Sequence, residues 1–187
     1  MKRISVMCLV LTLIVYISGC GSSGSNNTQN KIMSERREAA LEKAKEYFDT
    51  FTGLSYKSVV EYIKDKGYTE NEATYAADNC GKDWKEQALI RAKLYLNDEL
   101  GHSYKEMLSD LKDRDYFTEN EVEYAISNCG ADWKEQAFIN ANYYSNNGMA
   151  SVENLTSHLK EDKGFTDEQV NYAVEKYITK WKALGKF

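Results

Sequence analysis

The sequence predicts an all-α fold built from three tandem helical repeats of about 48 residues. Three observations support this: a ten-residue segment recurs almost unchanged, apolar residues follow helical spacing, and helix-capping residues precede the apolar runs. No stretch alternates convincingly with the period of two that is typical of strands. An N-terminal signal and a polar tether precede the repeats, which divides the chain into residues 1–19, 20–33, 34–82, 83–131 and 132–187.

The first nineteen residues have the pattern of an export signal. Lys2 and Arg3 form a basic start, and residues 4–17 are apolar apart from two polar positions. Fourteen helical residues reach about 21 Å, less than the roughly 30 Å hydrocarbon core of a bilayer, so a cleaved signal is favoured over a transmembrane helix. The segment ends in Ile17-Ser18-Gly19-Cys20, which resembles the lipobox of bacterial lipoproteins.

This ending predicts that the Cys20 thiol receives a diacylglyceryl group, the alternative being an ordinary cleaved signal with an incidental cysteine. Two acyl chains give a stable anchor where one would be marginal. We therefore expect an exported protein held on the outer face of the cytoplasmic membrane, at a Gram-positive cell surface. Residues 21–33 are small and polar, so they are expected to form a flexible tether with a reach of about 20 Å.

The internal repeat is the most informative feature of the sequence. Asn79–Ala88 returns as Asn128–Ala137 with one change, at a spacing of 49. Ser55-Tyr56-Lys57 returns at a spacing of 48 and Tyr68–Glu72 at 49, so one residue has been inserted between these blocks. A third copy continues through Phe165, Tyr172 and Trp181, each 48 residues after its counterpart in the second.

Each repeat is predicted to contain three short helices. In the first repeat the apolar stripes cover residues 40–51, 56–63 and 73–77. Ser55 and Ser103 are expected to be N-caps, and Gly81 and Gly130 to be left-handed residues after the third helix. Reciprocal capping boxes are predicted for four pairs: Thr69 with Glu72, Thr118 with Glu121, Asp83 with Glu86, and Asp132 with Glu135.

The stripes are small, so we expect neighbouring repeats to cover them and to share stability. Trp84, Trp133 and Trp181 recur at the repeat junctions, where a large aromatic side chain more often packs in a core than binds a ligand.

Composition argues against several classes of function. The formal charge is −5 and the pI about 5.2, which disfavours nucleic-acid binding. The two histidines, His102 and His158, do not occupy equivalent positions in the repeats, and no catalytic or nucleotide-binding motif is present. We therefore expect no enzyme activity, no metal and no cofactor; the oligomeric state is left open.

The middle repeat is the most acidic, with 5 basic and 10 acidic residues between positions 88 and 133. Six carboxylates lie around the turn between the second and third predicted helices of this repeat. They belong either to a solvated face with helix caps, which is favoured, or to a patch that attracts a basic partner. These residues are Asp110, Asp113, Asp115, Glu119, Glu121 and Glu123.

Cys80 and Cys129 are the cysteines left in the repeats. A disulfide between them would close a loop of nearly fifty residues and contribute on the order of 4 kcal/mol. Equivalent positions in units related by translation should, however, lie about 10 Å apart, beyond the 7 Å limit for a disulfide. Only a pseudo-two-fold arrangement would bring them together, so buried free thiols are favoured.

The pattern Ala-Leu-x-x-Ala-x-x-Tyr, at residues 40–47 and 88–95, resembles the Ltp family of host cell surface-exposed lipoproteins. The Ser-Tyr pairs, the aromatic-Thr-Glu helix starts and the Cys-Gly junctions are also similar. Departures are the third repeat, Tyr116 in place of a glycine, and Tyr177-Ile178 in place of Cys-Gly.

The resemblance implies helix-turn-helix-like repeats on a lipid-anchored protein. For phage-encoded members it implies superinfection exclusion, in which the protein blocks injection of incoming phage DNA through contact with the tape measure protein. The partner would then be a basic segment of a phage protein. A structural or adhesive envelope lipoprotein that binds a host or wall component is the alternative.

Overall fold

The computed structural model describes residues 25–146 and 151–185, and in these two ranges every regular element is a helix. The all-α prediction is therefore confirmed. The predicted lipidation site, Cys20, lies outside the described residues.

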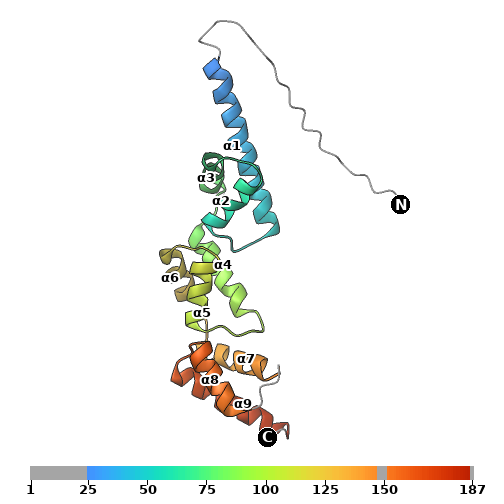
Figure 1. Cartoon of the computed structure of the whole chain (residues 1–187), viewed down its shortest axis with the longest axis vertical. Coiled ribbons are helices and arrows are strands. Elements are labelled where there is room, and N and C mark those ends of the chain that lie inside the picture. The colour runs from blue at the N-terminus through green and yellow to red at the C-terminus, as the bar shows by residue number, and fades with distance from the viewer. Residues whose placement is uncertain (1–24, 147–150, 186–187) are drawn as a thin grey trace, which may run out of the picture. The chain divides into compact units, whose positions relative to one another are not determined.

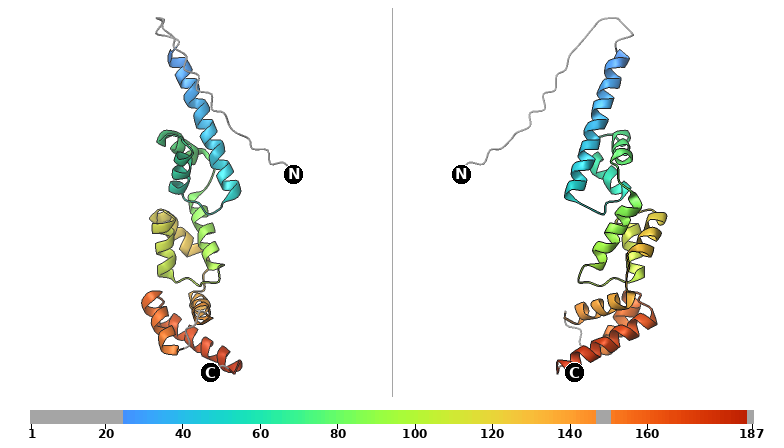
Figure 2. Two further views of the ribbon diagram at one scale, coloured as in Figure 1. Left: turned by 45° about the vertical axis from the view of Figure 1, so that its right-hand side comes forward. Right: turned by 180° about the vertical axis from the view of Figure 1, so that it is seen from behind.

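Three groups of helices correspond to the three repeats, and in each group the helices lie together (Figures 1 and 2). The first group consists of α1 (Ser25–Thr50), α2 (Tyr56–Asp65) and α3 (Glu70–Asn79). The second consists of α4 (Trp84–Leu96), α5 (Tyr104–Ser109), the π-helical turn η1 (Asp110–Arg114) and α6 (Glu119–Asn128). The third consists of α7 (Trp133–Asn146), α8 (Val152–Ser157), the π-helical turn η2 (His158–Asp162) and α9 (Asp167–Ala183).

The inserted residue of the second and third repeats is accommodated in a π-helical turn. In the first repeat Tyr68 follows Ser55 by 13 positions and α2 is regular. In the other two repeats the equivalent aromatic residue follows the serine by 14 positions, and the second helix ends in η1 or η2. A single insertion in an α-helix is commonly absorbed in this way. After the turn, the chain reverses through a left-handed residue, which is Gly67, Tyr116 or Gly164.

The predicted tether is partly helical, which corrects our expectation for its second half. The contacts divide the chain into residues 1–34 and residues 35–187, and in the first unit the described residues belong to α1 from Ser25 on. Their side chains are exposed from Asn27 to Ser34. Extending an existing helix costs little per residue, and no Gly or Pro follows Gly24 to interrupt it.

Each repeat encloses a hydrophobic core of its own. Ile63 is fully buried in the first core, Met107 and Leu111 in the second, and Leu159 in the third. Among the described residues, the next repeat adds to a core mainly through the tryptophan that begins its first helix. The expectation that neighbouring copies cover each other's apolar stripes was therefore largely wrong, because alanines on the first helix let the other two helices pack closely against it.

Most predicted helix caps are confirmed. Ser55 and Ser103 are N-caps, and the reciprocal boxes form at Thr69–Glu72 and Thr118–Glu121. The Asp83 and Asp132 carboxylates accept backbone N–H groups, as expected. Glu86 and Glu135, which were predicted to complete capping boxes with these aspartates, bind other residues instead.

The glutamates after these aspartates bind tyrosines of the third helices. The Tyr124 hydroxyl donates to Glu86 Oε1 at 2.5 Å, and the Tyr172 hydroxyl donates to Glu135. Tyr75 and Glu38 make the same bond in the first repeat, at 2.8 Å. One tyrosine–glutamate hydrogen bond thus ties the third helix to the first in every repeat.

Candidate partner-binding surface

The two cysteines of the repeats are unpaired, buried thiols. Cys80 belongs to the first core and Cys129 to the second. Each Sγ donates to a carbonyl three residues earlier, Ala77 or Ile126, at 3.2 Å. Burial raises the pKa of the Cys80 thiol above its ordinary value. These contacts assign the cysteines to packing, which agrees with the favoured prediction.

The tryptophans close the cores, and two of them lie at the repeat junctions. Trp84 meets the Tyr56 ring edge-on, with centroids 5.4 Å apart, and Trp133 meets Tyr104 in the same way at 5.7 Å. Trp181 packs against the third core beside Tyr177, but it lies within α9 and not at a junction, because α9 continues from Asp167 to Ala183 and no further repeat follows in the described residues. All three are partly buried.

A recurring set of polar contacts joins consecutive repeats. At the first junction, the Gly53 N–H donates to Gln87 Oε1 at 3.1 Å, and Arg91 Nε donates to the Gly53 carbonyl at 2.9 Å. A Cβ on Gly53 would lie only 3.0 Å from the Arg91 backbone nitrogen, and Gly53 has a φ of +65°. A glycine is therefore required where the loop meets α4.

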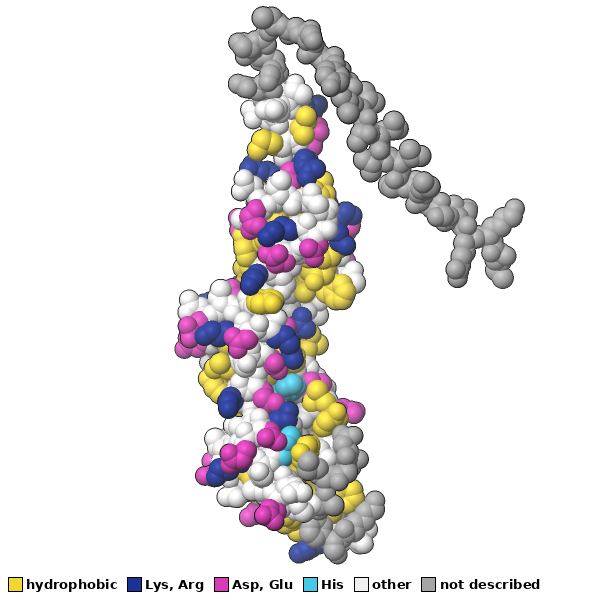
Figure 3. Space-filling view, viewed as in Figure 1, with side chains coloured by type: hydrophobic (Ala, Val, Ile, Leu, Met, Phe, Trp, Pro, Cys, Tyr) yellow, Lys and Arg dark blue, Asp and Glu magenta, His cyan; other side chains and the backbone are white. Residues whose placement is uncertain are grey.

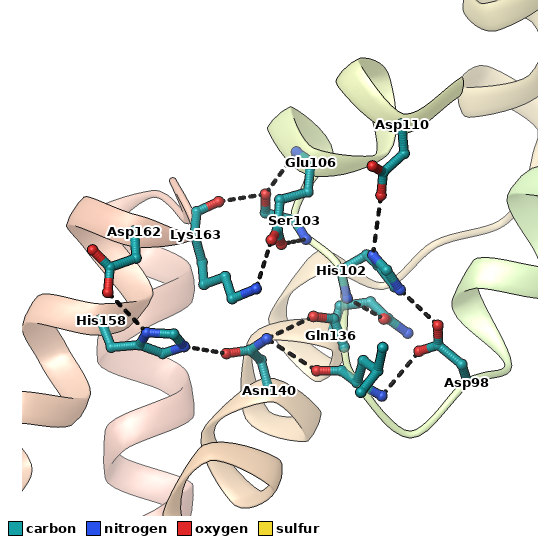
Figure 4. Close-up of polar contacts among 12 residues, drawn as sticks. Asp98, His102, Ser103, Glu106, Asp110, Gln136, Asn140, His158, Asp162 and Lys163 are labelled. Carbon is teal, nitrogen blue, oxygen red and sulfur yellow. Dashed lines mark hydrogen bonds and ion pairs between the residues drawn. The ribbon is translucent and has the colours of Figure 1, made fainter. Parts of the chain in front are cut away.

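The second junction repeats this arrangement (Figure 4). The His102 N–H donates to Gln136 Oε1 at 3.0 Å, and Asn140 Nδ2 donates to the Gly101 carbonyl at 2.8 Å. A Cβ on Gly101 would lie 2.4 Å from the Asn140 backbone nitrogen, which is not tolerable. The loop of one repeat is thereby fastened to the first helix of the next.

Further contacts extend the second junction into η2 (Figure 4). The Ser103 hydroxyl donates to the Lys163 carbonyl at 2.6 Å, and Lys163 Nζ binds Glu106 at 2.7 Å. His158 lies between Asn140 and Asp162, with its ring nitrogens 3.2 and 3.0 Å from their oxygens. These polar side chains therefore have structural partners.

The prediction from sequence missed the junction residues. Gln87 and Gln136 occupy the same place in the recurring ten-residue segment, and Gly53 and Gly101 each precede an N-cap serine by two residues. Their recurrence in the sequence indicated that these residues have the same structural role in both repeats. Nothing in one sequence, however, shows that residues 34 positions apart are bonded.

Three of the six carboxylates of the predicted acidic patch are held by contacts inside the protein. Asp110 is half-buried and 3.3 Å from Arg114, and burial raises the pKa of its carboxyl. Asp115 accepts the Tyr95 hydroxyl and lies 3.7 Å from Arg91. Glu121 accepts the Thr118 N–H in its capping box.

The other three carboxylates, Asp113, Glu119 and Glu123, are exposed. Asp113 accepts the Ser109 hydroxyl at 3.0 Å, and Glu119 lies 3.8 Å from Lys112. On the face shown in Figure 3, acidic and basic side chains are interspersed along the described repeats. Arg114 and Lys112 lie beside Asp110 and Glu119, so basic side chains interrupt the predicted acidic patch.

A groove in the second repeat brings exposed apolar and acidic side chains together. It has a volume of about 400 Å³ and is lined by residues of α5, η1 and α6 and by Trp133, the first residue of α7. We call it the repeat-2 groove. Its lining residues are Tyr104, Leu108, Lys112, Glu119, Val122, Glu123, Ile126, Ser127 and Trp133.

The corresponding face of the first repeat is closed by its own side chains. Tyr56 is half-buried, and its hydroxyl donates to Asp78 Oδ1 at 3.1 Å. The second repeat has Ser127 at the position of Asp78, and Val122 and Ile126 at the positions of Ala73 and Ala77. The acceptor is thus lost, and bulkier side chains stand where α2 and α3 meet in the first repeat.

The described residues hold no group of three or more His, Cys, Asp or Glu side chains fit to bind a metal ion. Within the same ranges, no helix is both long and apolar enough to span a bilayer.

Comparison with family models gives a match to Lipoprotein_Ltp, the host cell surface-exposed lipoproteins, over residues 36–80 and again over 132–176. The chain belongs to the Ltp family. Each match spans most of one helical repeat of this chain, the first repeat and the third. The comparisons with curated proteins and with solved structures gave no match.

Proposed function

We propose that this Ltp lipoprotein is a membrane-anchored binding module that excludes superinfecting phage. Anchored through Cys20, it would block injection of phage DNA by binding a basic segment of a phage injection protein, such as the tape measure protein. The observation that carries the proposal is the repeated match to a family of surface-exposed lipoproteins. The first twenty residues support it, because they have the sequence pattern of an export signal followed by a lipobox.

The anchor would supply a high local concentration at the place where DNA enters. A lipidated protein is confined to a thin layer above the membrane, so a weak contact with an arriving phage protein becomes effective there. The exposed carboxylates Asp113, Glu119 and Glu123 would attract a basic segment by charge.

The test compares wild type with Cys20→Ala in a host that lacks the gene. With wild type, phage adsorption should stay normal while entry of labelled phage DNA and plaque number fall. Cys20→Ala should lose the protection because the protein is no longer retained at the membrane. Blots of cell and medium fractions, together with labelling by a palmitate analogue, confirm where each variant is.

Undiminished DNA entry for every phage tested would contradict the proposal. A growth or adhesion defect that follows deletion of the gene without phage would instead favour a structural or adhesive envelope lipoprotein.

A further inference from the structure

We propose that the repeat-2 groove binds a basic amphipathic helix of a partner protein, with two apolar side chains in the groove and a Lys or Arg against its acidic rim. This rests on the proposed function only in assuming that the protein acts by binding another protein. The groove lies within a single repeat apart from Trp133, which begins the next one.

The groove presents two apolar side chains that are substantially exposed, although the Trp133 ring packs against the edge of one of them, Tyr104. Tyr104 is 51% exposed and Leu108 is 37% exposed, whereas Val60, the counterpart of Leu108, is 5% exposed. Exposed apolar surface in a concave site is typical of places where a partner's side chains are received.

Tyr104 also has an unused hydrogen-bonding group. Its counterpart Tyr56 donates to Asp78, whereas among the described residues the Tyr104 hydroxyl has no partner. A tyrosine with an apolar ring and a free hydroxyl is the kind of residue that dominates protein–protein contacts.

The rim of the groove selects the charge of the occupant. The Glu123 carboxylate makes no hydrogen bond or ion pair with any described residue, and Glu119 is 85% exposed. Lys112 lies 3.8 Å from Glu119, so it compensates one of the two carboxylates and leaves the rim negative. A cationic side chain next to the apolar anchors would complete the pairing.

The size of the groove is sufficient for two side chains of a helix. About 400 Å³ is at the lower end of the range of about 300–1,000 Å³ for binding pockets. An amphipathic helix presents apolar side chains one turn apart, at i and i+3 or i+4, which is the usual way of filling such a groove.

The experiment uses a labelled sixteen-residue peptide with leucines on one helical face and lysines beside them. Its affinity for the wild-type exported chain is measured by fluorescence anisotropy, and the site is mapped by NMR shifts. Shifts should concentrate at Tyr104, Leu108 and Trp133. Leu108→Ser should weaken binding about tenfold or more, as expected for a central interface residue.

Matched variants separate the groove from general stickiness. Leu94→Ser changes a leucine of α4 that is 44% exposed and outside the groove, and should leave affinity unchanged. Ser127→Asp restores the acceptor of the first repeat and should draw in Tyr104 and weaken binding. Glu123→Lys should weaken binding and reduce its dependence on salt. All four positions are at least partly exposed, and circular dichroism confirms that each variant folds.

Equal affinity of wild type and Leu108→Ser, or shifts that lie elsewhere on the protein, would overturn the inference. If the protein does not exclude phage but still binds the peptide in the groove, the proposed function is contradicted and the inference about the groove is supported. The two proposals can therefore fail separately.

Discussion

Single side chains differ in how much they contribute to the stability of a repeat. The ion pair between Arg36 and Glu72 has the clearest consequence, because it makes stability depend on pH. Arg36 Nε lies 2.6 Å from Glu72 Oε1, and a second guanidinium nitrogen lies 3.0 Å from Oε2. The same carboxylate accepts the Thr69 N–H at 2.8 Å. The hydrogen bond from Arg36 is the main cause that lowers the pKa of Glu72 from 4.5 to about 2.

A lowered pKa makes stability depend on pH in a defined direction. The contribution of Glu72 is fully present above pH 4.5 and is lost as the pH falls toward 2, because the unfolded chain takes up the proton first. Arg36→Gln should therefore lower the melting temperature at pH 6 and flatten its decline between pH 6 and 2. Thermal melts across this range measure both effects.

Lys45→Gln is the control for this experiment. Lys45 binds Glu42 at 2.7 Å, but both side chains are largely exposed, and such pairs contribute little. Identical pH profiles for Arg36→Gln and Lys45→Gln would refute the role given to Arg36.

At the scale of the elements, the ends of helices and turns are determined by residues close to them in the sequence. The contacts that hold one element against another involve residues far apart in the sequence. Ser55, Thr69 and Asp83 were predicted as caps from short-range patterns, and the structure confirms all three as N-caps. The inserted residue was also visible in the spacing. The spacing did not show that this residue would produce a π-helical turn, because an insertion can equally lengthen a loop.

Other features escaped prediction because they depend on contacts between distant residues. The bond from Gly53 to Gln87 spans 34 positions. The repeat-2 groove results from several replacements at once, among them Ser127 for Asp78. The acidic residues around it were predicted as a set, but only the structure shows that Asp115 faces Tyr95 while Glu123 faces solvent.

The junction glutamines should matter out of proportion to their size. Gln136→Ala removes the acceptor of the His102 N–H, which is buried, and an unsatisfied buried donor costs about 1–3 kcal/mol. Gln87→Ala should act in the same way on Gly53. Chemical denaturation gives the change in unfolding free energy, and amide exchange at His102 and Gly53 should become faster only in the matching variant.

Lys134→Ala, two residues before Gln136 on the same helix, controls for the loss of a side chain. Slow exchange at His102 in Gln136→Ala would show that another group accepts this hydrogen bond and that the junction does not depend on the glutamine.

At the scale of the whole molecule, the described residues form three separate cores, and each core has one tryptophan at its edge. The chain contains 3 tryptophans in all, so fluorescence of variants that keep a single one reports the unfolding of a single repeat. Leu159 is fully buried in the third core, and Leu159→Ala should cost about 2–5 kcal/mol. Its effect should be largest at Trp181 and smallest at Trp84.

Fluorescence of the three single-tryptophan forms during urea unfolding measures this difference. Coincident transitions in all three forms, shifted equally by Leu159→Ala, would show that the repeats unfold as one cooperative unit and that the separation of the cores has no thermodynamic effect.

Because each repeat encloses its own hydrophobic core, the number of repeats can change during evolution. Duplication or loss of one copy would expose no neighbour's interior beyond a tryptophan and a few hydrogen bonds at the boundary. Copy number can therefore drift with little penalty, and one copy can acquire substitutions that would be harmful in a shared interior. The opening between the helices of the middle copy is the kind of novelty that this freedom permits.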